Sequence, residues 1–270
     1  MKKRSIIIGV AVLLLPVISF FGYFIYKFKL LEDRHIRLVD GQVDNIRLIN
    51  LGNGDREYIA NVIREVSSCD PTVIALDIFF ETYDSTTVDT LLSNSIVTSN
   101  TILATRYKMG TAYAVHPKYL EVASGYGYAE LEIIKGYVSH FNVSEKEYKN
   151  EYERNHGAKK IFYFAYKIAH AVDSIAATKY LKEIPQSRIP VVISRLTDQF
   201  KIYDYKELNF PCADLRGKIV YLGYLGPTNE DKHKTYARYQ TEEDFETNEP
   251  DMYGSVIVAN QILMILEGIH

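Results

Sequence analysis

Five polar residues have the types and the spacing to form a chemical site. Each follows a short apolar run that is typical of a buried strand. They are Asn50, Asp77, Glu81, Asp231 and His233. If the runs are neighbouring parallel strands, the loops after them meet at one edge of the sheet, where α/β proteins usually bind ligands. Carboxylates beside a histidine could bind a divalent cation there or exchange protons with a substrate.

The same residues also have a structural explanation. Asp77 would then cap a helix or accept hydrogen bonds from loop backbone, and His233 would be exposed. No nucleophile elbow, phosphate-binding loop or Cys/His metal spacing accompanies them. We therefore expect no catalytic residue, no metal and no cofactor. The expected ligand-binding residues are Asn50, Asp77, Glu81 and Asp231. The alternative is a periplasmic hydrolase or metal-binding protein that uses Asp77, Glu81, Asp231 and His233.

A β-α-β unit would position the first of these residues. The run 43–49 predicts a strand, and Asp55 can cap a helix over 56–68. Apolar residues in that helix recur at the spacing of one face. The run 72–80 is apolar except at Asp77, which suits a strand buried on both faces of a parallel sheet.

The rest of the chain predicts a three-layer α/β/α domain with a mainly parallel sheet and a Tyr-rich insertion at 106–156. The sequence has 22 Tyr and no Trp, and tyrosines crowd the GYGYAE stretch. A long helix is expected over 158–181, and the last helix, 254–268, is apolar nearly all round and must be buried. The remaining expected elements are a helix at 87–94, strands at 101–105, 191–193, 200–203 and 219–223, and one or two antiparallel strands at about 133–141 within the insertion.

Residues 1–29 have the composition of a membrane anchor. Three cations precede the stretch 5–26, whose 22 residues include no charged one. A helix of that length crosses a hydrocarbon core about 30 Å thick, and the leading cations favour a cytoplasmic N-terminus. A cleaved signal peptide and a buried soluble helix are the alternatives. We expect a single-pass protein of the inner membrane with residues 30–270 as one periplasmic or extracellular domain.

Charge limits the partners of this domain. The formal net charge is −3, and residues 1–30 contain five cations and no acid, which leaves −8 for residues 31–270. An acidic body argues against nucleic acid and against docking on anionic lipid headgroups.

Two cysteines, Cys69 and Cys212, are far apart in the sequence. They could pair in an oxidising compartment, but two buried thiols are the more ordinary expectation, since free cysteine is commonly buried.

The ordered set of features resembles the second-type CHASE domain, a cyclase/histidine-kinase-associated sensory extracellular domain. The similarity lies in the Arg216-Gly217-Lys218 turn before a strand, Asp231 in the following loop, and a helix that begins at Gly254 and contains Ala259-Asn260. The run VIALDIFFE is also similar, and GYGYAE and IPVVISRL fall in the right order. The resemblance covers about residues 40–268.

This resemblance implies a non-catalytic sensory domain of a signalling receptor. The implied partner is a small ligand or a protein, with a homodimer as one option. Members of the family usually continue into several membrane helices and a cytoplasmic output domain. This sequence stops at His270, so the output lies in a longer polypeptide or the protein works without one of its own. The first and last elements of the domain should lie together near the bilayer.

Overall fold

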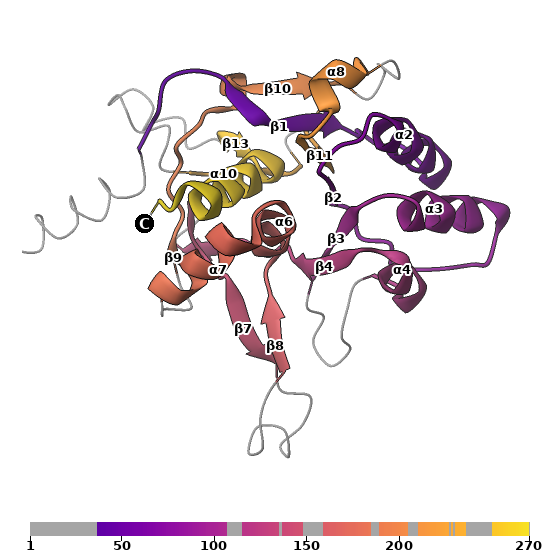
Figure 1. The fold of residues 1–270 in the computed structure, drawn as a ribbon, viewed down its shortest axis with the longest axis horizontal. Helices are drawn as coiled ribbons and strands as arrows, with labels where there is room; N and C mark the ends of the chain where they lie inside the picture. Colours follow the sequence, from indigo (N-terminus) through magenta and orange to yellow (C-terminus); the bar gives the residue numbers. More distant parts are fainter. Residues whose placement is uncertain are drawn as a thin grey trace, which may run out of the picture.

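The structure is a computed structural model of the 270-residue chain. It describes residues 37–106, 115–134, 137–147, 159–184, 189–204, 210–226, 228, 230–235 and 250–269. The fold is α/β, with a parallel sheet at its centre and helices on both faces (Figure 1).

Six parallel strands make the main sheet, in the order β10-β1-β11-β2-β3-β4. Their bounds are Phe200–Tyr203 for β10, Val43–Asn50 for β1, Ile219–Gly223 for β11, Val73–Leu76 for β2, Thr101–Thr105 for β3 and Gly125–Tyr128 for β4. Each of these strands was predicted near these positions except β4. Strand β2 is shorter than the expected 72–80, because the chain leaves the sheet at Asp77 and is irregular up to the next helix.

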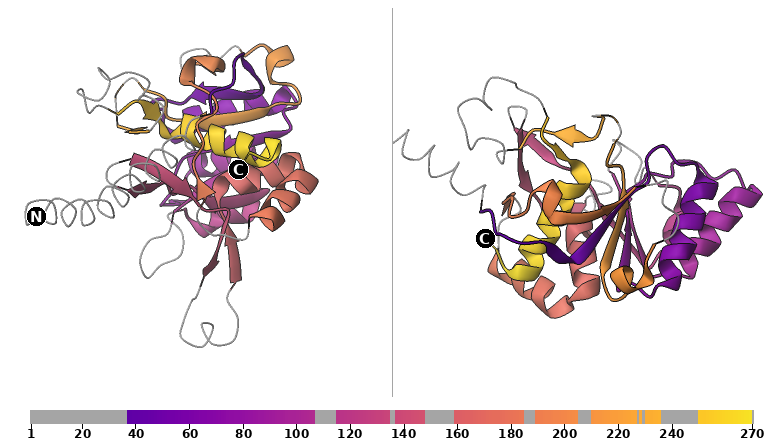
Figure 2. Two further views of the ribbon diagram at one scale, coloured as in Figure 1. Left: turned by 90° about the vertical axis from the view of Figure 1, so that its left-hand side faces the viewer. Right: turned by 90° about the horizontal axis from the view of Figure 1, so that it is seen from above.

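Successive residues of the central strands pack on opposite faces of the sheet, so two cores form. On β2, Ile74 and Leu76 contact one core, whereas Val73 and Ala75 contact the other. Four helices cover the first core: α2 (Arg56–Ser68), α3 (Thr87–Val97), α4 (Pro117–Val122) and α8 (Cys212–Leu215). Three helices cover the second core: α6 (Phe164–Val172), α7 (Ser174–Glu183) and α10 (Gly254–Glu267). Figure 2 shows these two helical layers on either side of the strands.

The predicted helix over 158–181 is wrong in its first part and at its middle. Residues 159–162 are instead strand β8, Lys159–Phe162, paired antiparallel with β7, Ser144–Glu147. The helical part is then broken at Asp173, whose carboxylate accepts hydrogen bonds from the backbone of Ile175 and Ala176 and so starts α7 as a new helix.

Three further pieces of sheet surround the main one. Strands β5, Glu132–Ile134, β6, Tyr137–Phe141, and β9, Ile189–Pro190, form one antiparallel sheet. Strands β5 and β6 are two antiparallel strands where one or two were predicted, around 133–141. A short 3-10 helix, η1, spans Thr197–Gln199 before β10. Strands β12, Lys232–His233, and β13, Met252–Tyr253, pair antiparallel just before α10.

Cys69 and Cys212 form a disulfide, so the expectation of two buried thiols is wrong. Cys69 follows α2 and Cys212 begins α8, and their Cα atoms lie 4.6 Å apart although 143 residues separate them in sequence. Two helices that cover the same face of the sheet bring them together, and this contact is not readable from sequence spacing.

Among the residues that the structure describes, no helix combines the length and the apolar character that crossing a bilayer requires. The predicted anchor, residues 5–26, lies outside those residues and stays a prediction.

The two ends of the described chain lie at the same end of the molecule (Figures 1 and 2). Arg37 and Val39 donate backbone hydrogen bonds to Ile193 and Ser194, and Arg195 forms an ion pair with Glu267 at the end of α10, at 4.0 Å. The carboxyl ends of the strands point the other way, toward the beginning of α10. Helix α10 therefore runs from the carboxyl edge of the sheet back to the chain ends.

Candidate functional site at the carboxyl edge of the sheet

A small antiparallel sheet places Asp231 against the beginning of α10. Strands β12 and β13 pair Lys232 with Tyr253, and Asp251 secures the end of this hairpin by accepting hydrogen bonds from the backbone and hydroxyl of Thr235 at 2.7 and 2.6 Å. The backbone oxygen of Asp231 accepts a hydrogen bond from the amide of Gly254, at 2.9 Å.

The Asp231 carboxylate lies directly over Gly254, so a side chain at position 254 would displace it. A Cβ at this position would stand 2.8 Å from Oδ2 of Asp231. The carboxylate thus sits at the N-terminus of α10, where the partial positive charge of the helix favours an anion. His233 lies on the other side, with Nε2 3.5 Å from Oδ1 of Asp231.

Asp77 reaches the same place from the end of β2. Its Oδ2 accepts a hydrogen bond of 2.6 Å from the hydroxyl of Tyr221, a fully buried side chain of β11. The pKa of Asp77 is raised to about 6, chiefly by burial and also by the negative charge of Asp231, while the Tyr221 hydrogen bond works in the opposite direction. We call Asp77, Tyr221, Asp231 and His233 the rim cluster.

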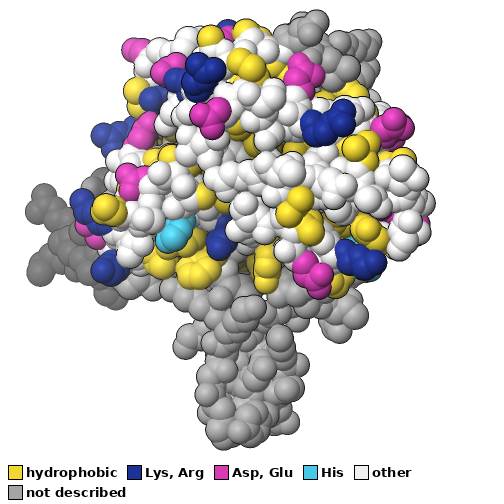
Figure 3. All heavy atoms as spheres, turned by 45° about the vertical axis from the view of Figure 1, so that its right-hand side comes forward, with side chains coloured by type: hydrophobic (Ala, Val, Ile, Leu, Met, Phe, Trp, Pro, Cys, Tyr) yellow, Lys and Arg dark blue, Asp and Glu magenta, His cyan; other side chains and the backbone are white. Residues whose placement is uncertain are grey.

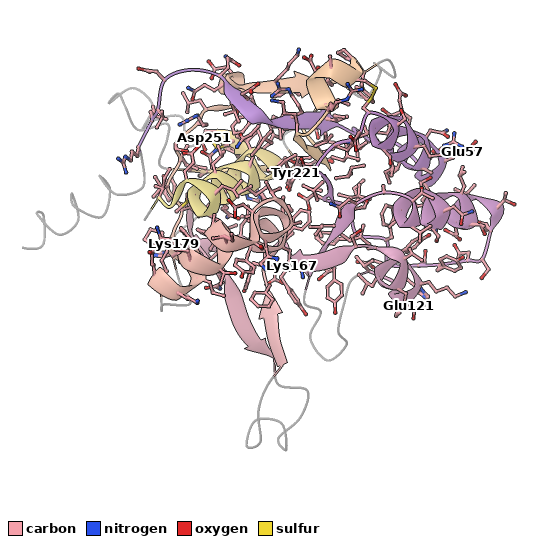
Figure 4. The ribbon with its side chains drawn as sticks, in the orientation of Figure 1. Glu57, Glu121, Lys167, Lys179, Tyr221 and Asp251 are labelled. Atoms are coloured by element: carbon pink, nitrogen blue, oxygen red, sulfur yellow. A yellow bond between two sulfur atoms is a disulfide. The ribbon has the colours of Figure 1, made fainter. Side chains whose placement is uncertain are left out.

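Burial also raises the pKa of Tyr221 well above its usual value, and the charge of Asp77 adds to this. Its hydroxyl therefore stays protonated and can donate a hydrogen bond throughout the physiological pH range. Figure 4 shows Tyr221 between α10 and the strands. Ser255, in the first turn of α10, completes the surroundings and donates to the backbone oxygen of Tyr224, at 3.2 Å.

Asn50 lies at the same edge of the sheet, but its side-chain amide already makes hydrogen bonds to neighbouring loops. Its Oδ1 accepts from the amides of Gly52 and Leu225, at 3.0 and 2.9 Å. Its Nδ2 donates to the oxygen of Gly226, at 3.4 Å, and to Asp204, at 3.3 Å. Asn50 thus fastens the loop after β11, the loop that leads to Asp231.

Glu81 contacts a different group of residues. It forms an ion pair of 2.6 Å with Arg106, and both side chains are close to half exposed. The guanidinium of Arg106 in turn lies over the ring of Phe79, 5.1 Å from its centre. The structure therefore brings Asp77 and Asp231 together as predicted, while Asn50 and Glu81 have other contacts.

A buried ionic network supports the loop that carries Asp77 and Glu81. Asp89, fully buried on α3, accepts hydrogen bonds from Arg56 at 2.6 Å and from the hydroxyl of Tyr119 at 2.7 Å. Burial alone would raise the pKa of Asp89, but the bonds from Tyr119 and from the backbone of Asp84 and Thr86 hold it well below its usual range. The network joins α2, α3 and α4 to the loop.

Sequence reasoning missed Tyr221 and Ser255 as members of this site. The alternation of side chains along a strand was one available signal. Tyr221 pairs with Ala75, and Asp77 lies two residues after Ala75, so Tyr221 and Asp77 point to the same face of the sheet. Ser255 follows the glycine that begins a helix, which is a usual place for a residue that contacts a neighbouring loop.

Within the described ranges, no group of three or more His, Cys, Asp or Glu side chains is placed to hold a metal ion. An open hollow of about 490 Å³ runs along α7, far from Tyr221 in Figure 4, where Lys179 marks its position. Its lining is Ser174, Ile175, Thr178, Lys179, Lys182 and Glu183. On the face drawn in Figure 3, cationic and acidic side chains are interspersed, without an extended basic strip.

One of three comparisons with known proteins found a match. Searches of curated proteins and of solved structures returned no match. A family model for the CHASE2 domain matches residues 7–270, which include the whole sheet, the rim cluster and α10. The chain therefore belongs to the CHASE2 domain family of extracellular sensory domains.

Proposed function

We propose that this chain is the extracytoplasmic sensory domain of a membrane-anchored signalling receptor and that it binds a ligand without catalysing a reaction. In this proposal residues 1–29 are the anchor, with the N-terminus in the cytoplasm, and residues 30–270 form the sensory domain. The family membership supports the sensory role. The disulfide supports an oxidising compartment, where such bonds persist.

The observation that carries the proposal is the path of α10. Its N-terminus lies under Asp231 in the rim cluster, and its last turn contacts Arg195, beside the start of the described chain. A ligand at the rim cluster would thus touch an element that reaches the side of the domain from which the chain leaves toward the predicted anchor. Sensory domains need such a connection, because the ligand and the membrane lie on opposite sides.

The proposed ligand carries a hydrogen-bond donor or a positive charge. Asp77 and Asp231 would supply the acceptors, Asn50 would shape the neighbouring loop, and Glu81 would lie at the outer margin of the same edge. Primary amines and amino acids have suitable donor groups. The Tyr221 hydroxyl is committed to Asp77, at 2.6 Å, so it would orient that carboxylate rather than meet the ligand first.

A thermal-shift screen tests this proposal. A panel of amino acids, small amines and polar metabolites is added to the parent chain and to Asp77→Ala and Asp231→Ala, each compared with its own ligand-free melting temperature. A ligand present at about 100 times its Kd stabilises the parent by about 2.7 kcal/mol, a shift of several degrees. Both variants should lose that shift.

The control is Asp84→Asn, a carboxylate of the same loop whose contact is with Arg56 at 3.9 Å. It should keep the full shift. An equal shift in Asp77→Ala and in the parent would contradict the assignment of this site.

A further inference from the structure

Residues 37–42 form an exposed strap along the segment 193–199. The amides of Arg37 and Val39 donate to the oxygens of Ile193 and Ser194, at 3.1 and 3.0 Å. The side chain of Gln199 adds bonds to the oxygens of Val39 and Gly41, at 2.7 and 3.0 Å. A few hydrogen bonds at an exposed surface hold a segment weakly, so the strap can open without unfolding the domain.

Asn260 of α10 holds residues 194–195, the part of the segment to which Val39 of the strap is bound. Asn260, fully buried in the middle of α10, accepts hydrogen bonds at Oδ1 from the amides of Ser194 and Arg195, at 2.9 and 2.8 Å. Its Nδ2 donates to the oxygen of Arg195, at 3.0 Å. Both halves of the amide are used, so the position of 194–195 follows the position of α10.

The same side chain is bonded to the first turns of its own helix. Nδ2 of Asn260 also donates to the oxygen of Val256, at 3.0 Å. Val256 follows Ser255, which is bonded to Tyr224, and Gly254, which is bonded to Asp231. Hydrogen bonds together with the backbone of the first turn of α10 therefore connect Asp231, Asn260, residues 194–195 and the strap.

We propose that α10 is a relay through which the state of Asp231 at its N-terminus controls whether the strap stays bound at residues 193–199. This inference rests on the proposed sensory function and assigns its output route. Helix α10 suits the role because its residues Gly254 to Ile265 are all buried, so it moves as a packed unit. Its 14 residues span about 21 Å. The strap is the output element, since it leads toward the predicted anchor at 5–26.

Hydrogen–deuterium exchange on the full chain tests the relay. Two variants are used singly and together: Asp231→Asn, which removes the charge at the beginning of α10, and Asn260→Ala, which removes the bond to 194–195. Asp231→Asn should speed exchange at the amides of Arg37 and Val39 by about fivefold, and Asn260→Ala by about tenfold, as expected for losing one or more hydrogen bonds.

The double variant decides between coupling and two independent effects. If α10 is the relay, Asp231→Asn adds no further acceleration at the strap once Asn260 is alanine. Multiplicative effects in the double variant, or an unchanged strap in Asp231→Asn, would overturn the proposal. Asp84→Asn, with no hydrogen bond to α10, is the matched control and should leave exchange at the strap as in the parent.

Exchange in β2 and β3 must stay at the parental rate in every variant, so that a change at the strap is not a general loss of stability. Asn260→Leu replaces Asn260→Ala if the alanine variant does not fold, since leucine fills a similar volume and makes none of the hydrogen bonds to 194–195. The experiments distinguish a failure of the proposed binding site from a failure of the relay. Loss of the thermal shift in Asp77→Ala with an unresponsive strap would leave the sensory site standing and overturn the relay alone.

Discussion

Asp77 is the residue whose environment makes the clearest prediction about pH. Its pKa of about 6 in the folded chain lies above its ordinary value of 3.8. The folded state therefore keeps a proton that the unfolded state loses as the pH rises from about 4 to 6, and stability falls over that window. Asp77→Asn cannot ionise, so its stability relative to the parent should rise by on the order of 2 kcal/mol between pH 4 and 7.

Urea unfolding at a series of pH values measures this difference. Tyr221→Phe is an informative companion, because the Tyr221 hydrogen bond lowers the pKa of Asp77. Its removal should extend the decline in stability to higher pH. A constant difference between Asp77→Asn and the parent from pH 4 to 7 would contradict the raised pKa of Asp77 in the folded chain.

Asp89 illustrates the opposite case, a buried carboxylate that stays charged because every oxygen is bonded. Asp89→Ala would leave Arg56 without its closest partner and Tyr119 without its acceptor. We expect a loss of about 3 kcal/mol in the free energy of unfolding. Tyr119→Phe removes one hydrogen bond and should cost about 1 kcal/mol. Chemical denaturation of the two variants checks the order, and equal costs would be inconsistent with a charged network.

At the scale of the elements, β4 contains a matched pair of glycines. A Cβ at Gly127 would lie 2.7 Å from the Cα of Phe164, where α6 begins, whereas a Cβ at Gly125 would meet only the flexible end of Lys167, at 3.4 Å. Gly127→Ala should therefore destabilise the chain by about 1–3 kcal/mol, since backbone would have to move. Gly125→Ala is the control and should be nearly neutral. Similar denaturation midpoints for both would mean that α6 does not pack on β4.

Elements with local signals could be predicted from the sequence. Helix α2 begins at Arg56 and ends at Ser68 as expected, because an Asp cap and a regular apolar face specify it within its own residues. The region 158–181 was not predictable in the same way. Its apolar spacing is helical throughout, but the pairing of β8 with β7 and the cap at Asp173 override that pattern.

The site was predictable to the same limited degree. Strand ends and following polar residues identified Asp77 and Asp231, since parallel neighbours bring their loops to one edge. The role of Asn260 was not readable, although the residue itself was noted in the resemblance. Its four hydrogen bonds to Ser194 and Arg195 depend on how α10 packs on a segment about 65 residues away.

At the scale of the whole molecule, the disulfide links regions that fold as one body. Closing a loop of this length, 143 residues, lowers the entropy of the unfolded chain and so stabilises the fold by about 5 kcal/mol. The Cys69→Ala/Cys212→Ala variant should unfold at a correspondingly lower denaturant concentration. Reduction of the parent should lower its midpoint to that of the variant, and a parent insensitive to reductant would show that the bond contributes nothing.

Whether the same two cysteines are paired in cells shows whether the domain reaches an oxidising compartment. In cells, free thiols are blocked before lysis, and the chain is then reduced and labelled. The full sequence should carry two newly labelled cysteines, because they were paired. A version without residues 1–29, which would stay in the reducing cytoplasm, should have both blocked from the start. Identical labelling of the two versions would contradict the role of residues 1–29 in export.

The order of strands in the sheet also dictates when the domain can fold. Strand β1, the first along the chain, lies between β10 and β11, which are among the last. Its register is set by Phe200–Tyr203 and Ile219–Gly223, so it has no neighbour in the sheet until those residues have been synthesised. Pairings of such high sequence separation form slowly. The nascent domain therefore waits with an apolar strand unpaired, and a chaperone that shields residues 43–50 should raise its yield more than one that acts on α2 or α3.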